Sequence, residues 1–185
     1  MKRIFLIPVF AMALLATNTA TTYAQEKTVM VGGAAMYPSK NIVENAVNSK
    51  DHTTLVAAVK AAGLVETLSS PGPFTVFAPT NAAFDKLPKG TVGNLVKPEN
   101  KATLTSILTY HVVSGAMDSK MIMLKLKASG GKIMLKTVNG GELTLMMKGK
   151  NLMIMDAKGG MAKVTIKDVY QKNGVIHVID TVLMP

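Results

Sequence analysis

Three histidines carry the most direct potential for catalysis or metal binding: His52, His111 and His177. They are scattered along the chain and lack the i, i+4 spacing that places two imidazoles on one helix face to bind zinc. His177 and Asp180 are three residues apart in an expected strand, so their side chains point to opposite faces. The sequence therefore predicts neither a conventional zinc centre nor a His–Asp dyad.

The motifs of common enzyme classes are also missing from the sequence. It contains no Gly-x-Ser-x-Gly elbow, no Gly-x-Gly-x-x-Gly and no phosphate-binding loop. It has no cysteine, which excludes disulfides and thiolate metal sites. We expect a protein that is not an enzyme and needs no cofactor.

Methionine is the one residue type whose distribution indicates a possible metal site. Nine of the 14 methionines lie between positions 117 and 161. Two Met-x-Met pairs are the candidate soft-metal ligands: Met121, Met123, Met153 and Met155. In a strand, this spacing puts both thioethers of a pair on one face, and such ligands suit Cu(I) or silver. The alternative is that methionine replaces other aliphatic residues in a packed core or an adaptable apolar surface. The second interpretation is favoured, and a Cu(I) site is kept as the alternative.

Lysine is concentrated in the same part of the chain. Residues 117–172 contain 11 lysines against four acidic residues, a charge of +7. Such a region attracts anionic glycans, lipopolysaccharide, phospholipid head groups or nucleic acid through a non-specific field that salt screens. The candidate partner contacts are Lys148, Lys150, Lys158 and Lys163. The alternative is that these lysines only solvate strands and protect sheet edges.

Specific nucleic-acid recognition is not expected. The single arginine is Arg3, aromatic residues make up 5% of the chain, and no nucleic-acid-binding signature is present. The expected partner is therefore a surface protein, or an anionic polysaccharide or other component of the cell envelope.

The N-terminus has the layout of a secretory signal. Lys2 and Arg3 precede an apolar run over 4–16, and a polar stretch ends at Ala24. The run is shorter than the ~20 residues that a membrane-spanning helix needs. We predict cleavage after Ala24, export to the periplasm or beyond the cell, and no transmembrane segment in the mature chain.

The remaining chain fits one domain. Without Lys2 and Arg3, 19 basic residues stand against 11 acidic ones, a net charge of +8. The expected organisation is a signal peptide over 1–24, a lead-in over 25–36 and one monomeric domain over 37–185, which is long enough to bury a hydrophobic core.

The first half of the chain follows helical spacing. One helix is predicted over 53–63, ending at a glycine cap, and another over 100–111, with His111 on its buried face. A shorter helix is expected over 41–48. The segment 74–78 is apolar on both faces, which indicates an interior strand.

The second half follows the pattern of strands. Its apolar segments are separated by four glycine turns: Asn139-Gly140-Gly141, Lys148-Gly149-Lys150, Lys158-Gly159-Gly160 and Asn173-Gly174. The last strand, expected over 175–183, is apolar on both faces and should be central in its sheet. Asp118 can cap a short helix, although the alternation of Leu124 and Leu126 equally suits a strand. Helices followed by strands predict an α+β domain.

Three segments resemble the fasciclin family in their order and spacing: FTVFAPTNAAF at 74–84, LTYHVVSG at 108–115 and NGVIHVIDTVLMP at 173–185. The resemblance implies a wedge-shaped β-sandwich with helices packed along one edge, in secreted or surface-attached proteins that mediate adhesion. Tyr110 and His111 match the motif that some animal members use in receptor contact. The alternative for His111 is an interior histidine bonded to backbone. The resulting expectation is an exported, non-enzymatic adhesion or binding module.

Overall fold

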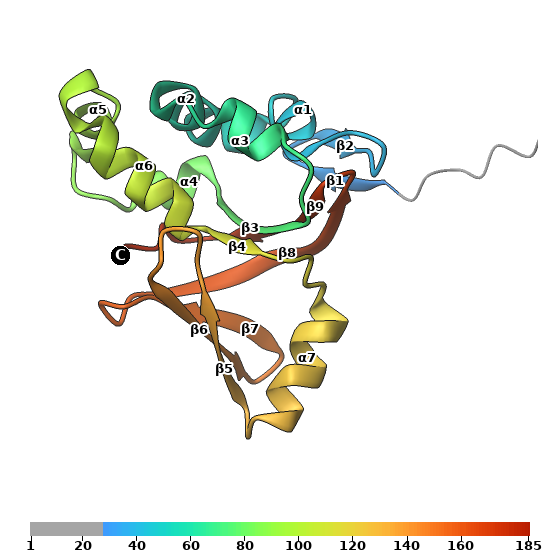
Figure 1. The fold of residues 1–185 in the computed structure, drawn as a ribbon. Coiled ribbons are helices and arrows are strands. Elements are labelled where there is room, and N and C mark those ends of the chain that lie inside the picture. The colour runs from blue at the N-terminus through green and yellow to red at the C-terminus, as the bar shows by residue number, and fades with distance from the viewer. Residues whose placement is uncertain (1–27) are drawn as a thin grey trace, which may run out of the picture.

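A computed structural model describes residues 28–185, which contain a strongly curved sheet with most of the helices on one side of it (Figure 1). The predicted signal peptide over 1–24 lies outside the described residues. Among those residues, no helix combines the length and the apolar character needed to cross a membrane.

The helical elements gather mainly in the first part of the described chain (Figure 1). They are α1 (Ile42–Ala46), η1 (Lys50–His52), α2 (Thr53–Ala62), α3 (Val65–Ser69), α4 (Asn81–Asp85), α5 (Thr91–Leu95), η2 (Pro98–Asn100), α6 (Lys101–Tyr110) and α7 (Ser119–Ala128). Local signals explain two boundaries: the Asn41 side chain caps α1 in a capping box with Glu44, and Gly63 ends α2 at a φ of 73°.

Helix α7 resolves the ambiguity at 118–129 in favour of a helix. The Asp118 side chain accepts a hydrogen bond from the Met121 amide and so caps the first turn. Ile122 and Leu126, four residues apart, are both buried, whereas Leu124 is 68% exposed. The strand interpretation is wrong because the helical period, and not the alternation, decides which side chains reach the core.

The strands form two sheets. A short hairpin joins β1 (Val29–Val31) to β2 (Ala34–Met36). The main sheet has the order β4-β3-β9-β8-β7-β6-β5. Its strands are β3 (Phe74–Pro79), β4 (Val112–Ser114), β5 (Lys132–Lys136), β6 (Glu142–Lys148), β7 (Asn151–Met155), β8 (Met161–Gln171) and β9 (Gly174–Ile179). Only β3 and β9 pair in parallel within this sheet.

The main sheet curls until its two ends meet. A single bridge between Val113, on β4, and Thr137, just beyond β5, brings the first and last strands together. The predicted α+β class is confirmed, as is a curved, sandwich-like sheet with helices packed against it. This closure encloses one core inside the curl and leaves a second core between the sheet and the helices.

Strands β3 and β9 separate these two cores. Val76 and Val178 pack toward α2 and α6, whereas Phe77 and Ile179 pack inside the curl. Every residue of β9 is buried. The prediction that the segments 74–78 and 175–183 carry central strands is therefore confirmed, with one difference at the C-terminal end.

That difference is the point at which β9 stops. The strand ends at Ile179 and not at 183, although Val182 and Leu183 remain buried. Side chains replace strand partners here: the Leu183 amide donates to Nε2 of His111, and the Met184 amide donates to Oδ2 of Asp156. The chain can leave the sheet because its buried donors are satisfied elsewhere.

Candidate functional site

Tyr110 is a fully buried connector at the end of α6. Its hydroxyl donates to the Glu142 carbonyl oxygen at 2.7 Å and accepts from the Ala157 amide at 2.9 Å. The ring lies so close to Gly141 that an added Cβ there would sit 2.8 Å from Cε2 of Tyr110. Tyr110 therefore joins α6 to the β5–β6 and β7–β8 turns.

His111, the next residue, is 3% exposed. Its Nδ1 lies 2.8 Å from the Ile107 carbonyl oxygen, and its Nε2 accepts from the Leu183 amide at 3.0 Å. Nδ1 is therefore the protonated nitrogen of a neutral ring. Burial lowers its pKa from 6.5 to about 4, against smaller opposing effects from the Ile107 carbonyl and Asp156.

The structure does not support direct partner contact by Tyr110 or His111. Both side chains are buried, and their polar atoms are occupied by backbone groups. The interpretation of His111 as an interior histidine bonded to backbone agrees with these contacts. A partner would meet the surface that these two residues organise, not their side chains.

His177 and Asp180 are likewise separate structural groups. Nε2 of His177 lies 2.8 Å from the Met117 carbonyl oxygen, and Nδ1 accepts from the Asp168 amide at 3.3 Å. Burial lowers the pKa of His177 below its ordinary value. The ring also stacks on Phe77, with 5.8 Å between ring centroids. No hydrogen bond joins His177 to Asp180 among the described residues.

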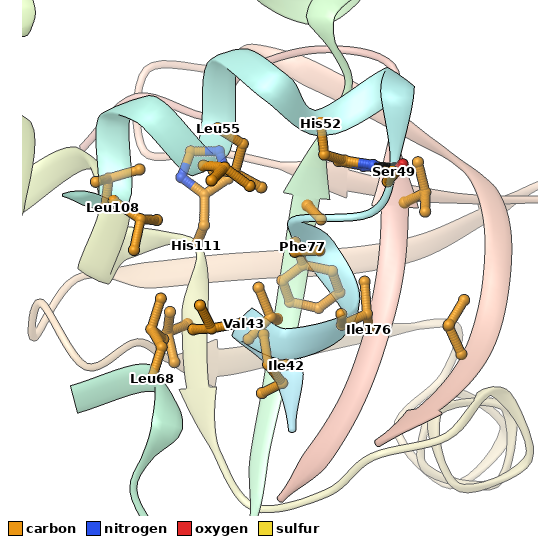
Figure 2. Close-up of a pocket in the computed structure, with 18 of the residues that line it drawn as sticks. Ile42, Val43, Ser49, His52, Leu55, Leu68, Phe77, Leu108, His111 and Ile176 are labelled. Carbon is orange, nitrogen blue, oxygen red and sulfur yellow. Dashed lines mark hydrogen bonds between the residues drawn. The ribbon is translucent and has the colours of Figure 1, made fainter. Parts of the chain in front are cut away.

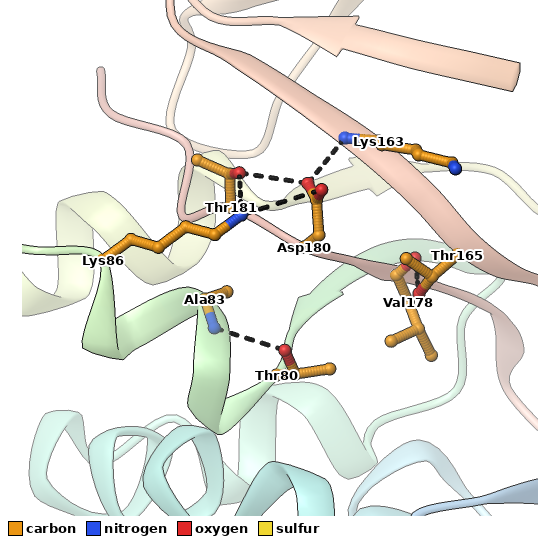
Figure 3. Close-up of polar contacts among 8 residues, drawn as sticks. All are labelled: Thr80, Ala83, Lys86, Lys163, Thr165, Val178, Asp180 and Thr181. Atoms are coloured by element: carbon orange, nitrogen blue, oxygen red, sulfur yellow. Dashed lines mark hydrogen bonds and ion pairs between the residues drawn. The ribbon is translucent and has the colours of Figure 1, made fainter.

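Asp180 instead organises the junction that follows β9 (Figure 3). Its Oδ1 accepts from the Lys163 amide at 2.8 Å and from the Thr181 hydroxyl at 3.0 Å. Its Oδ2 lies 3.7 Å from Nζ of Lys86. The pKa of Asp180 lies below its ordinary value because these hydrogen bonds and Lys86 outweigh the opposing effect of desolvation.

The outer face of strands β5 to β8 is the most distinctive surface of the described chain. Inward-facing Leu143, Leu145 and Ile154 are fully buried in the core inside the curl. The alternate positions point outward and include Glu142, Thr144 and Asn151. We call the outward lysines and methionines the Lys–Met face: Lys132, Met134, Lys136, Met146, Lys148, Met153, Met155, Met161 and Lys163.

Strand register arranges this face in two rows. The first row runs Lys132, Met146, Met153 and Lys163 across β5, β6, β7 and β8. The second row runs Met134, Thr144, Met155 and Met161 across the same strands. Directly opposed residues in antiparallel strands have Cβ atoms about 5 Å apart, so neighbouring side chains in each row are within contact reach.

The four lysines predicted as partner contacts lie along this part of the sheet. Lys148 and Lys150 flank the β6–β7 turn, and Lys158 lies in the β7–β8 turn at the opposite end of β7. Lys163 lies between these ends, opposite Met153. Strand β7 separates the two turns by five residues, about 16 Å at the usual rise. The lysines therefore follow the sheet and do not form one compact cluster.

The four methionines predicted as metal ligands divide into two groups. Met153 and Met155 share the outer face of β7, as expected for a strand. Met121 and Met123 lie on α7, where residues two apart point in different directions: Met121 is exposed and Met123 packs partly against the core. The shared-face prediction is wrong for this helical pair.

Sequence reasoning missed Met146 and Met161, which face Met153 and Met155 across the ladder. The alternation of β6 was the available signal, because Leu143 and Leu145 leave Met146 on the other side. Pairing register, by contrast, is not visible in one sequence. Within residues 28–185, no cluster of three or more histidine and acidic side chains could hold a metal ion.

Comparisons with known proteins agree with this fold. The Fasciclin domain model matches residues 50–185. Protein sll1483 of Synechocystis sp. is 44% identical over 95% of this chain and 91% of its own length. The cell surface glycolipoprotein MPB83 of Mycobacterium bovis is 35% identical over 88% of this chain and 69% of its own length.

The structural comparison finds a pair of domains from an insect cell adhesion molecule, Fasciclin I. The TM-score is 0.69, and the match covers 80% of this chain and 52% of that one. Sequence identity is 19%, so this match concerns the fold alone.

Proposed function

Because the chain belongs to the fasciclin domain family, we propose that it is an exported adhesion module whose Lys–Met face binds an acidic patch on a surface protein. A relative described as a cell surface glycolipoprotein supports the setting. The observation that carries the proposal is the row Lys132, Met146, Met153 and Lys163, in which two cations flank two thioethers.

The charge on this face is available for binding. Four of its lysines alternate with or flank methionines, and Glu142 is the acidic residue that pairs with Lys136 in the ladder. Among residues 28–185, the single ion pair joins Lys86 to Asp180, so no carboxylate of this region lies within ion-pairing distance of the face lysines. An acidic surface would gain attraction from them, and the attraction would fall with salt.

The methionines favour a protein over a polysaccharide as the partner. Thioether side chains are flexible and polarizable, which suits an apolar surface that must adapt to a partner. The residues of the Lys–Met face include no aromatic ring that could stack on a sugar. An acidic protein surface with some apolar area therefore matches the face better than an anionic glycan does.

Binding to an envelope extract tests the proposal. The chain from residue 25 onward should bind in 50 mM salt and lose at least tenfold in affinity in 500 mM salt. The double variant Lys132→Glu/Lys163→Glu should lose a similar amount in low salt. A matched control, Lys97→Glu/Lys101→Glu, changes the same charge at exposed positions near α6 and should bind like the parent.

Two results would overturn this function. Binding that is equal in both salts and in both variants removes the charged face from the interaction. Binding that survives protease treatment of the extract but not removal of its glycans identifies an anionic polysaccharide as the partner instead.

Binding of Cu(I) is the second candidate function. Met146 faces Met153, and Met155 faces Met161, so four thioethers lie on adjacent positions of three strands. Calorimetry with Cu(I) under reducing conditions should show heat that is lost in Met153→Leu/Met155→Leu and kept in Met121→Leu/Met123→Leu. The absence of any heat at micromolar protein rules this candidate out.

A further inference from the structure

Helix α7 differs from the other helices in where its apolar side chains lie. Leu68 of α3 and Leu108 of α6 belong to a core that they share with Ile176 of β9 (Figure 2). Figure 1 shows α7 at another margin of the domain, apart from these helices. It buries Ile122 and Leu126 in the core inside the curl, yet apolar side chains also occupy its opposite face.

This outward face, which we call the α7 stripe, consists of Met121, Leu124 and Ala128. Spacings of three and four residues place these side chains on one side of a helix. At about 100° per residue, Leu124 points away from the midpoint between the buried Ile122 and Leu126. Leu124 is 68% exposed, the largest fraction among the large hydrophobic residues of the described chain, and Met121 is 44% exposed. The α7 stripe is therefore an apolar surface that nothing within residues 28–185 covers.

Lysines border the α7 stripe on both sides. Around the helix axis, Lys120 and Lys127 fall on one side of the stripe and Lys125 on the other, each roughly a quarter turn from its centre. Residues 119–136 contain five lysines and no acidic residue. None of these lysines forms an ion pair within the described part of the chain. The stripe is thus an apolar surface with cations along both borders.

The acidic residues at the start of α7 are already occupied. Oδ1 of Asp118 accepts from the Met121 amide at 2.8 Å, and Oδ2 accepts from the Tyr170 hydroxyl at 3.1 Å. The Asp168 carboxylate accepts from the backbone amide and the hydroxyl of Ser119. These carboxylates hold the N-terminal end of the helix in place, and the lysine borders stay cationic.

We propose that the α7 stripe rests on an anionic lipid bilayer, with Met121 and Leu124 at the acyl boundary and the bordering lysines among the head groups. A helix that has an apolar face and a lysine-rich polar face lies in the plane of the membrane interface. Lysine suits the borders because its aliphatic stem covers apolar surface while its ammonium group reaches the phosphates. This contact goes beyond the proposed function and does not depend on the Lys–Met face.

The length of the stripe favours a lipid surface over a partner helix. Helix α7 has 10 residues, which span about 15 Å at the helical rise. A coiled coil is indicated only when an apolar stripe continues over about three heptads or more. A bilayer imposes no register on the residues that touch it, so a short stripe is sufficient for a reversible contact. The lysines add an attraction to anionic head groups that salt screens.

A tryptophan probe tests the contact, because the chain contains no tryptophan of its own. The chain from residue 25 keeps every described residue and lacks the apolar run over 4–16, which would itself enter a bilayer. In Leu124→Trp, vesicles of phosphatidylglycerol and phosphatidylcholine in 50 mM salt should shift the emission to shorter wavelengths, and vesicles of phosphatidylcholine alone should not. Met134→Trp is the matched control. Met134 is 66% exposed on the Lys–Met face, and the emission of this variant should stay unchanged.

Neutralising the borders tests the role of charge. Lys120→Gln/Lys125→Gln removes one lysine from each border and should weaken sedimentation with the anionic vesicles at least fivefold, as should 500 mM salt. Lys97→Gln/Lys101→Gln removes the same charge at exposed positions near α6 and should bind like the parent protein.

Three results would overturn the proposal. The first is a parent chain that does not sediment with anionic vesicles in 50 mM salt, a measurement on the unaltered protein that holds even if a variant fails to fold. The second is an equal emission shift in Leu124→Trp and Met134→Trp, which would place the membrane against the Lys–Met face as well. The third is a shift produced by polyglutamate and not by vesicles, which would identify an acidic polypeptide as the occupant. The vesicle assay contains no protein partner, so its failure leaves the proposed function of the Lys–Met face unaffected.

Discussion

Nε2 of His111 accepts a hydrogen bond from the backbone amide of Leu183 at 3.0 Å, which ties the end of α6 to the C-terminal segment. The contact requires an unprotonated Nε2, since a protonated ring could only donate. The opposite nitrogen is already committed to the Ile107 carbonyl. Protonation of His111 therefore conflicts directly with the way the chain leaves β9.

Stability should fall as the pH drops from 6.5 to 4. Burial lowers the His111 pKa from 6.5 to about 4, so in this window the unfolded chain binds a proton that the folded chain does not. The contribution of His111 to the free energy of unfolding is fully present above pH 6.5. About 3 kcal/mol of it is lost by pH 4. His52 and His177, whose pKa values are also lowered, act in the same direction.

Urea unfolding at pH 7.5, 5.5 and 4.5 measures this loss. The pKa values of Asp118 and Asp180 lie below the ordinary 3.8, so their contributions are lost only at still lower pH. The variant His111→Leu should be less stable at pH 7.5 and show a shallower pH dependence. Equal stability of the parent protein at pH 7.5 and 4.5 would contradict the role assigned to the buried histidines.

Tyr110→Phe should destabilise the fold by about 1–3 kcal/mol. The change leaves the Glu142 carbonyl and the Ala157 amide without the hydroxyl that now joins them. Thermal or urea unfolding gives the magnitude. Binding to the envelope extract should stay unchanged under conditions in which the variant is folded. A weaker affinity of the folded variant would instead show that partner binding depends on the Tyr110 hydroxyl.

Gly141→Ala should also be destabilising, by about 1–3 kcal/mol, because the new methyl group would lie 2.8 Å from Cε2 of the buried Tyr110 ring. Gly93→Ala is the matched control. Gly93 lies within α5, its added Cβ would meet nothing within 4 Å, and alanine should raise stability by up to about 1 kcal/mol. If both variants change stability equally, the Tyr110 contact is not the cause.

Local rules were sufficient to predict much of the fold. Apolar spacing predicted α2 and α6, and two-sided apolarity identified β3 and β9 as central strands. Such signals lie within a few adjacent residues, where helix and strand periods differ. The end of β9 could not be predicted in this way, because it depends on His111 and Asp156, which accept hydrogen bonds from distant segments.

The candidate sites were less predictable for the same reason. Lys163 and Met153 were each selected from the sequence, but their pairing across the ladder depends on register. Met121 and Met123 were wrongly expected to share a face. Two residues in a Met-x-Met pair lie on one face in a strand, but these two lie on a helix.

Asn173 makes long-range contacts that its neighbouring residues in the sequence do not predict. Its sequence context, Asn-Gly, indicates only a hairpin turn. In the structure, Oδ1 accepts from the Ile42 amide at 3.0 Å, and Nδ2 donates to the carbonyl oxygens of Leu68 and Ser70 at 2.8 and 2.9 Å. One buried amide therefore fastens the β8–β9 turn to α1 and to the end of α3.

Asn173→Asp should destabilise the protein by more than about 2 kcal/mol at pH 7.5, because a buried carboxylate would replace two donors and face two carbonyl oxygens. Protonation restores one donor, so the difference from the parent protein should narrow as the pH falls toward 4. Asn151→Asp makes the same change at the exposed start of β7 and should alter stability by at most about 0.5 kcal/mol. Urea unfolding of both variants at pH 7.5 and 4.5 checks the sign and the trend. A tolerated aspartate at position 173 would mean that the helices do not depend on this turn for their attachment to the sheet.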